Sequence, residues 1–222
     1  MTTLIELVNR VLLDVGERQV TTIATPASRK AKAYIQDAFN DIQMFHNWEW
    51  LNVFQGVDSL INEKATYTNI RRIRAVYWNN GTTYIEVPWI PYSSFIKREI
   101  TSFDSGLTTN QPCVYTQEDE DTISVNPYPT DVAGRDKIRL EGIKYIEPPE
   151  LETDVLQIPE RFENILIKRA VYNMLIRHLG EPDMANAMNF EFTDILQRFK
   201  DQENRTPMKG TNMYAGRRVT RW

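Results

Sequence analysis

Apolar residues recur at helical spacing in the N-terminal part of the chain. Thr3 and Glu6 fit a capping box, and the apolar positions that follow predict a helix over residues 3–15, which Gly16 ends. A second, longer apolar face follows Pro26, a residue favoured in the first turn of a helix. We therefore expect two helices before the pattern changes.

Helical spacing returns near the other end of the chain. Two adjacent apolar stripes run from Pro159 to Gly180, and two stripes indicate a helix buried on more than one side. The short Glu181-Pro182 link predicts that the next helix runs antiparallel to it. The residues of this fourth helix that we expect to face inward are Met184, Met188, Phe192, Ile195, Leu196 and Phe199.

From residue 48 to 157 β-branched and aromatic residues alternate with polar ones, which is typical of strands. Residues 80–81, Asn-Gly, predict a tight hairpin turn. A longer strand is expected over residues 137–146, with a bulge at Gly142. Residues 91–98 are expected to form one short helix.

These patterns predict an α+β protein. We expect an antiparallel four-helix bundle from residues 1–47 and 158–203, with an inserted antiparallel β module at 48–157. An extended C-terminal tail, residues 204–222, has too little periodic apolar content to fold on itself.

Composition is that of a globular protein, with 41% hydrophobic and 25% charged residues in a chain of 222. The single cysteine, Cys113, excludes an intramolecular disulfide and indicates a reducing compartment. No apolar stretch approaches the roughly 20 residues that a membrane span needs, and no signal peptide is recognisable. We expect a soluble, cytoplasmic protein without a membrane partner.

Charge is unevenly distributed. The net charge is −4, yet residues 204–222 carry five basic and no acidic residues, which leaves −9 on residues 1–203. Such a body is unsuited to general DNA binding, which depends on neutralising phosphates.

The sequence offers little catalytic chemistry. It contains no phosphate-binding glycine loop, no nucleophile elbow and no His-Glu-x-x-His motif. His46 and His178 each end a predicted helix, where we expect a capping or interfacial role. The protein is predicted not to be an enzyme, with no cofactor and no metal.

The densest acidic run lies at the tip of a second predicted hairpin. It consists of Glu118, Asp119, Glu120 and Asp121. Neighbouring strand side chains face opposite ways, so we expect a solvated tip or a contact with a partner, while an ion site stays open. The acids around Pro148-Pro149 are expected to lie in a solvated linker.

Tryptophans cluster near the predicted domain junction and in the β module. They are Trp48, Trp50, Trp78 and Trp89. Aromatic side chains at junctions are more often packing or subunit-interface anchors than ligand pockets, and we expect that role here.

The end of the chain mixes arginines with aromatic residues. The candidate partner-binding residues are Met213, Tyr214, Arg217, Arg218, Arg221 and Trp222. These residue types dominate binding hot spots, so we expect the tail to dock on a partner protein. Contact with nucleic acid and an inert tail are the alternatives.

Two stretches of the chain carry recognisable motifs. The first is Leu-Ile-Glu-Leu-Val-Asn-Arg-Val-Leu at residues 4–12, closed by Gly16-Glu17. The second is Ile-Pro-Glu-Arg-Phe at 158–162, followed by an apolar helix and Gly-Glu-Pro at 180–182. Together they resemble head-to-tail adaptor (connector) proteins of tailed bacteriophages, the family that includes tail tubular protein A.

The resemblance implies a virion structural protein that forms a dodecameric ring between the portal protein and the tail nozzle protein. The genome would leave through this ring, so the protein would be close to genomic DNA transiently and without sequence specificity. The helical part would build the ring, the β module would reach toward tail components, and the tail would dock on the portal.

The residues alone leave three other classes of protein open. A stopper or nozzle subunit is the nearest alternative. A nucleic-acid-binding regulator would need a basic face on the body, and a small hydrolase would need a nucleophile with a base.

Overall fold

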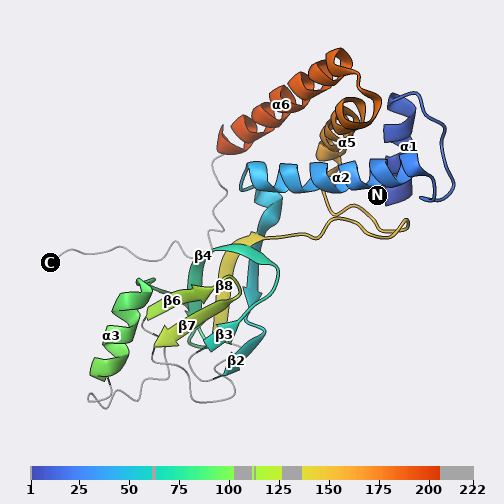
Figure 1. Cartoon of the computed structure of the whole chain (residues 1–222). Coiled ribbons are helices and arrows are strands. Elements are labelled where there is room, and N and C mark those ends of the chain that lie inside the picture. The colour runs from blue at the N-terminus through green and yellow to red at the C-terminus, as the bar shows by residue number, and fades with distance from the viewer. Residues whose placement is uncertain (1, 62–63, 103–111, 113, 127–136, 206–222) are drawn as a thin grey trace. The chain divides into compact units, whose positions relative to one another are not determined.

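The computed structural model describes residues 2–61, 64–102, 112, 114–126 and 137–205. The chain divides into two compact units. The helical unit consists of Met1–Trp50 and Glu147–Trp222, and the β unit consists of Leu51–Ile146. Two segments far apart in sequence therefore build the helical unit (Figure 1).

Four α-helices make up the described part of the helical unit. They are α1 (Leu4–Asp14), α2 (Pro26–Phe45), α5 (Glu160–Met174) and α6 (Pro182–Arg205). A 3-10 helix, η1 (Glu49–Leu51), follows α2, and α5 continues into a π-helical turn, η2 (Leu175–Leu179).

Local signals set the ends of these helices. The Glu6 carboxylate accepts the Thr3 N–H at 2.8 Å, which completes the predicted capping box. The Thr25 hydroxyl accepts the Ser28 N–H at 3.2 Å at the start of α2. Gly180 ends η2 with φ 73°, a left-handed conformation that favours glycine. The predicted starts of α1 and α2 and the stop at Gly180 are confirmed.

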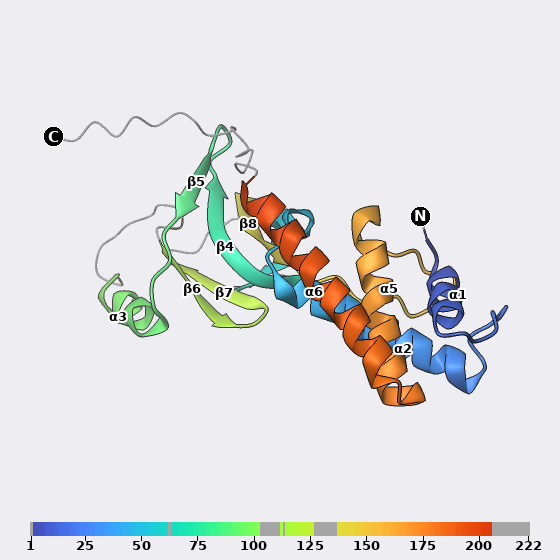
Figure 2. The same ribbon diagram turned by 90° about the horizontal axis from the view of Figure 1, so that it is seen from above.

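Helix α5 is the centre of the helical unit, with α1, α2 and α6 packed against it. Its buried residues are Phe162, Ile165, Leu166, Ile167, Ala170, Val171, Asn173 and Met174. They occupy more than one face of the helix, as its two apolar stripes predicted. Helix α6 runs antiparallel to α5 (Figure 2), as predicted. Two ion pairs show this direction: Arg161 at the start of α5 pairs with Glu203 near the end of α6, and Lys168, further along α5, pairs with the earlier Glu191.

The predicted antiparallel four-helix bundle is wrong. The described residues contain five α-helices and two antiparallel sheets, and the helices of the helical unit surround α5 rather than enclosing a shared central core. In a bundle each helix buries one stripe toward such a core. Hydrophobic periodicity shows which residues of a helix are buried, but it does not show how the helices cross.

One residue of α6 also differs from its prediction. Phe192 and Leu196 are buried as expected, but Met184 is 52% exposed, and Ala185 takes the buried position instead.

The β unit contains two four-stranded antiparallel sheets, ordered β1-β8-β4-β5 and β2-β3-β7-β6. The first sheet is formed by β1 (Asn52–Gly56), β8 (Ile138–Lys144), β4 (Ile70–Asn79) and β5 (Tyr84–Val87). The second is formed by β2 (Ser59–Ile61), β3 (Lys64–Thr66), β7 (Thr122–Asn126) and β6 (Val114–Asp119). The sequence predicted a single β module without this division into two sheets.

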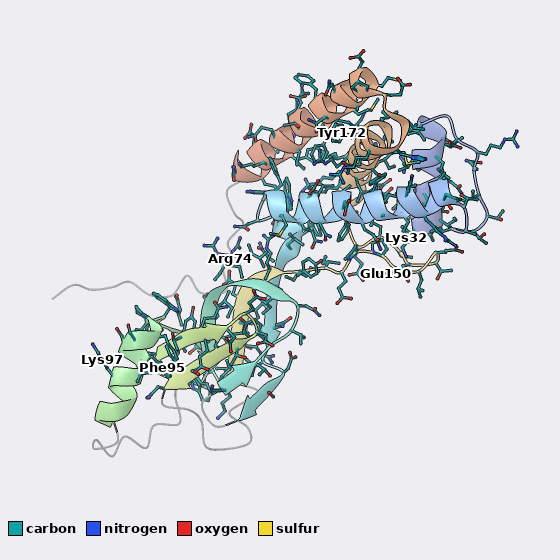
Figure 3. All side chains as sticks on the ribbon, viewed as in Figure 1. Lys32, Arg74, Phe95, Lys97, Glu150 and Tyr172 are labelled. Atoms are coloured by element: carbon teal, nitrogen blue, oxygen red, sulfur yellow. The ribbon has the colours of Figure 1, made fainter. Side chains whose placement is uncertain are left out.

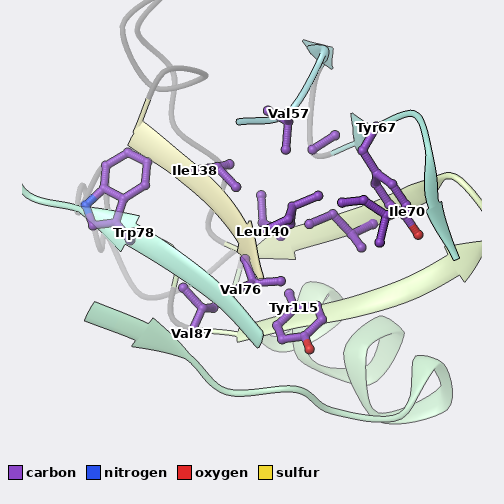
Figure 4. Close-up of a cluster of buried hydrophobic side chains, with 12 residues drawn as sticks. Val57, Tyr67, Ile70, Val76, Trp78, Val87, Tyr115, Ile138 and Leu140 are labelled. Carbon is purple, nitrogen blue, oxygen red and sulfur yellow. The ribbon is translucent and has the colours of Figure 1, made fainter. Parts of the chain in front are cut away.

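Side chains from both sheets form one apolar core (Figure 4). Trp78, Val87 and Leu140 come from the first sheet, and Tyr115 and Ile123 come from the second. In the second sheet, consecutive residues of β6 and β7 are buried, including the polar Thr116 and Ser124, so these strands are buried on both faces.

The predicted hairpins are present. The Asn79 and Asn80 side chains accept backbone N–H groups of the turn between β4 and β5, and Gly81 has φ 95°. Helix α3 (Tyr92–Ser102) follows β5 and is longer than the predicted helix over 91–98.

Gly142 does not bulge β8. The irregularities lie in β4, between Ile70 and Arg72 and between Ile73 and Ala75. A Cβ at Gly142 would lie 2.7 Å from the Arg72 carbonyl oxygen, so the glycine permits a close approach of β4.

Candidate functional site

The predicted partner-binding residues lie outside the described part of the chain. They are Met213, Tyr214, Arg217, Arg218, Arg221 and Trp222. The structure does describe the last turns of α6, from which this tail continues. We call the contacts around that end of α6 the tail root.

Glu203 is the centre of the tail root. Its carboxylate accepts a hydrogen bond from Arg161 at 2.7 Å and from the Glu49 backbone N–H at 3.1 Å, and it lies 3.9 Å from the His46 ring nitrogen Nε2. The Glu203 side chain is only 10% exposed. The end of α6 is thereby fastened to the start of α5 and to the segment after α2.

Aromatic rings pack beside these polar contacts. The Arg161 guanidinium lies over the rings of Phe162 and Phe199, at 5.1 and 5.5 Å from their centroids. The buried Trp48 packs edge-on against Phe162 at 4.8 Å and donates its Nε1–H to the Ile42 carbonyl at 2.6 Å. Packing is therefore the role of Trp48, as predicted for the junction tryptophans.

The two histidines occupy structural positions at helix ends. His46 follows α2 and contacts the Trp48 ring edge-on at 4.8 Å. His178 lies in η2, where its Nδ1 is 2.8 Å from the Lys30 ammonium. A lysine donating to Nδ1 requires a lone pair there, so this ring nitrogen is an acceptor. Neither arrangement pairs a histidine with a nucleophile.

The acidic run of the β6–β7 hairpin does not converge on one point. Glu118 points toward Lys64, with 2.7 Å between Oε2 and the ammonium, and the Thr122 hydroxyl donates to Asp121. Within the described residues no three His, Cys, Asp or Glu side chains are grouped so as to hold a metal ion.

Lys64, Ser124 and Glu118 form a trio across β3, β7 and β6. The Ser124 hydroxyl donates to Glu118 Oε1 at 2.5 Å. Burial raises the pKa of Glu118, but the hydrogen bonds from Lys64 and Ser124 outweigh burial and lower it overall. The bond to Glu118 raises the pKa of Lys64. Lys64 therefore stays protonated at neutral pH and cannot act as a general base toward the Ser124 hydroxyl. The Lys64–Glu118 ion pair and the Ser124–Glu118 hydrogen bond instead join the three strands.

The segment after the β unit, residues 147–157, forms a strap held against α1 and α2. Glu147 and Glu150 are exposed, as expected for a solvated linker, whereas Glu152 and Asp154 are partly buried and accept backbone N–H groups. Lys32 of α2 lies beside Glu150, as Figure 3 shows, and donates to its backbone carbonyl at 2.7 Å and to its carboxylate at 3.3 Å. Gln36 of α2 donates to the Pro149 carbonyl at 2.9 Å. Val155 forms a β-bridge with Thr3. No local sequence pattern predicts these contacts, because they join residues more than 100 positions apart.

The strap borders a groove with a volume of about 620 Å³. Its lining combines acidic and apolar residues: Glu147, Pro148, Pro149, Glu150, Asp154, Val155, Leu156 and Gln157. Backbone N–H groups of Leu151 and Glu150 donate to the Asp154 carboxylate and lower its pKa, so this rim residue is ionised at neutral pH.

Several large apolar side chains are exposed. Phe190 on α6 is 75% exposed and Leu151 in the strap is 66% exposed. In the β unit Trp89 is 57% exposed. Single exposed apolar side chains are normal on protein surfaces, so these three residues do not by themselves define a binding surface. Among the described residues no helix is long and apolar enough to cross a membrane.

The polar clusters described above, around Glu203 and around Glu118, fasten elements of the chain to one another. The chain matches the model of the SU10 adaptor protein family over residues 2–218. It therefore belongs to the SU10 adaptor protein family, a family of phage adaptor proteins, and is a structural component of the virion. Membership implies contacts with portal and tail components, and adaptor proteins are not known as enzymes. No curated protein matches the chain.

Proposed function

We propose that this protein is a head-to-tail adaptor of the tail tubular protein A type, which forms a dodecameric ring between the portal and the tail nozzle. In this ring DNA passes through the centre, and the C-terminal residues 213–222 of each subunit dock on the portal.

The charge distribution is the observation that carries the proposal. Five basic residues and no acids follow residue 203, whereas residues 1–203 carry a net charge of −9. An arginine-rich segment can pair with carboxylates of a partner, and Tyr214 and Trp222 can fill apolar pockets. The family match runs as far as Arg218, so it includes most of this segment.

The structure supports the tail as the docking element because its attachment point is fixed. The tail root holds the last turns of α6 through Glu203 and Arg161. Every subunit of a ring would present its tail from the same position. Many modest contacts then add up to strong binding through avidity.

The acidic body also suits a ring around DNA. A wall with net negative charge discourages phosphate contacts, so that DNA passes without being held.

Binding to purified portal rings tests the proposal. We expect Arg217→Gln/Arg218→Gln to weaken binding, measured by co-sedimentation with portal rings and by electron microscopy of the mixture. Arg18→Gln/Arg29→Gln is the matched control, because it removes the same charge from exposed residues of the helical unit. Equal effects of the two double variants, or full binding by a chain truncated after residue 205, would refute tail docking.

A further inference from the structure

The strap groove combines an acidic rim with an apolar lining. Glu147, Glu150 and Asp154 line the groove together with the apolar residues Pro148, Pro149, Val155 and Leu156. The Glu150 carboxylate lies 3.3 Å from the Lys32 ammonium, and the Asp154 carboxylate accepts two backbone N–H groups. Glu147 is exposed and takes part in no hydrogen bond or ion pair among the described residues. A ligand that suits this lining carries both cations and large apolar groups.

The groove is already formed in the folded chain. Leu4 and Leu156 join the strap to α1 through backbone hydrogen bonds to Asp154 and Thr2, at 3.0 and 3.1 Å. The Asp154 carboxylate closes a turn by accepting the N–H groups of Glu150 and Leu151 at 2.8 and 2.7 Å. A preformed site binds with less loss of conformational entropy than one that must be ordered on binding.

The chain contains one segment with the complementary chemistry. Residues 213–222 carry three arginines, a tyrosine and a tryptophan, and no acidic residue. We propose that this C-terminal segment docks in the strap groove of its own chain when no other partner is bound. One of its arginines pairs with Glu147 at the rim, because the Glu150 carboxylate already pairs with Lys32, and an aromatic ring packs on the proline and valine side chains.

The geometry of the chain allows this docking within one molecule. Helix α6 and the strap belong to the same compact unit. Arg217 lies twelve residues beyond Arg205, and an extended chain of that length spans up to roughly 40–43 Å. Covalent attachment keeps the segment at an effective concentration in the millimolar range, which favours the chain's own groove over that of a second copy.

Docking in the groove has a consequence for assembly. A tail held by its own strap must be released before it binds elsewhere. The groove would therefore keep the tail from binding another protein until a surface that binds it more tightly is present. The docking itself does not rest on the proposed function, and its test contains no portal.

Distance measurements between spin labels on the full chain test the proposal. The labels are placed at Thr153→Cys, an exposed strap residue outside the groove lining, and at Thr220→Cys, with Cys113→Ser removing the native thiol. We expect a narrow population of short distances that persists when labelled protein is diluted into an excess of unlabelled protein. Glu147→Lys should lower this population about twofold to fivefold, the range that one exposed ion pair provides.

Glu17→Lys is the matched control. It makes the same charge change at an exposed residue of the helical unit outside the groove, and it should leave the short distances unchanged. Raising the ionic strength from about 0.01 to 1 M, which shortens the Debye length from roughly 30 to 3 Å, should also lower the short-distance population in the unchanged protein.

Three results would overturn the proposal. A broad distribution that neither salt nor Glu147→Lys alters would show that the groove does not hold the tail. Loss of the short distances on dilution would assign the groove to the tail of a second copy. An equal loss in the Glu17→Lys variant would show that net charge, and not the groove, controls the tail.

Discussion

Replacing Gly142 with alanine is expected to destabilise the β unit. A Cβ at this position would lie 2.7 Å from the Arg72 carbonyl oxygen and 2.8 Å from Ile70 Cγ2, and real Cβ atoms essentially never approach other atoms this closely. The first of these atoms is backbone, so β4 itself must shift. Overpacking of this kind costs about 1–3 kcal/mol.

Part of that cost is offset because alanine restricts the unfolded chain more than glycine does. Gly→Ala within a strand or helix favours folding by about 0.5–1 kcal/mol where no clash occurs. The net loss for Gly142→Ala is therefore between zero and about 2.5 kcal/mol. Since 1.4 kcal/mol is a factor of ten, exchange of the β4 and β8 amides should accelerate by up to roughly 60-fold.

Gly56→Ala is the matched control in the same sheet. A Cβ at Gly56 would lie 2.6 Å from Arg139 Nη1, the end of a flexible side chain that can turn away. Hydrogen exchange measured by mass spectrometry should show faster exchange in β4 and β8 for Gly142→Ala only, with α5 unchanged in both variants. Equal exchange in the two variants would refute the close approach of β4 as the reason for Gly142.

Three further predictions address the tail root, the strand trio and the exposed surface. Glu203→Gln removes the charge that Arg161 binds, and we expect the last turn of α6 to lose about 1 kcal/mol and to exchange its amides roughly fivefold faster. The folded pKa of Glu118 is lowered, so its contribution to stability is present above its unfolded pKa, near 4.5, and is lost as pH falls through the lowered value. Urea unfolding followed by circular dichroism should therefore show a weaker acid dependence in Glu118→Gln. Phe190→Ser should change stability by less than about 0.5 kcal/mol, because this ring is exposed, but should reduce self-association in sedimentation if the ring belongs to a subunit contact.

Local chemistry made the helix ends predictable. The capping box at Thr3, the proline after Thr25 and the left-handed Gly180 each act within a few residues, so the sequence contains the whole signal. The Asn-Gly turn between β4 and β5 is predictable for the same reason.

Long-range packing was not predictable in this way. The central position of α5 depends on how three other helices cross it, and the two-sheet division depends on pairings such as β3 with β7. A glycine in a strand indicates either a bulge or a close approach, and only the partner strand decides between them at Gly142.

The candidate site contains one feature that is visible in the sequence and one that is not. The basic and aromatic character of residues 213–222 is visible in the sequence, and these residues lie outside the described part of the chain, so their role remains a prediction. The strap groove escaped prediction because its acids, taken alone, are typical of a solvated linker. Its order comes from Lys32, Gln36 and the α1 backbone, which are distant in sequence.

The separation of charge between body and tail gives salt opposite effects on two kinds of contact. Copies of a body with a charge of −9 repel one another, and screening weakens this repulsion as salt rises. Contacts between bodies through apolar groups such as Phe190 should therefore strengthen with salt, whereas ion pairs made by the tail should weaken. Sedimentation of the free protein and portal binding, each measured across a salt series, should thus have slopes of opposite sign. Slopes of the same sign would mean that the tail also mediates contacts between copies, and that the acidic body does not oppose them.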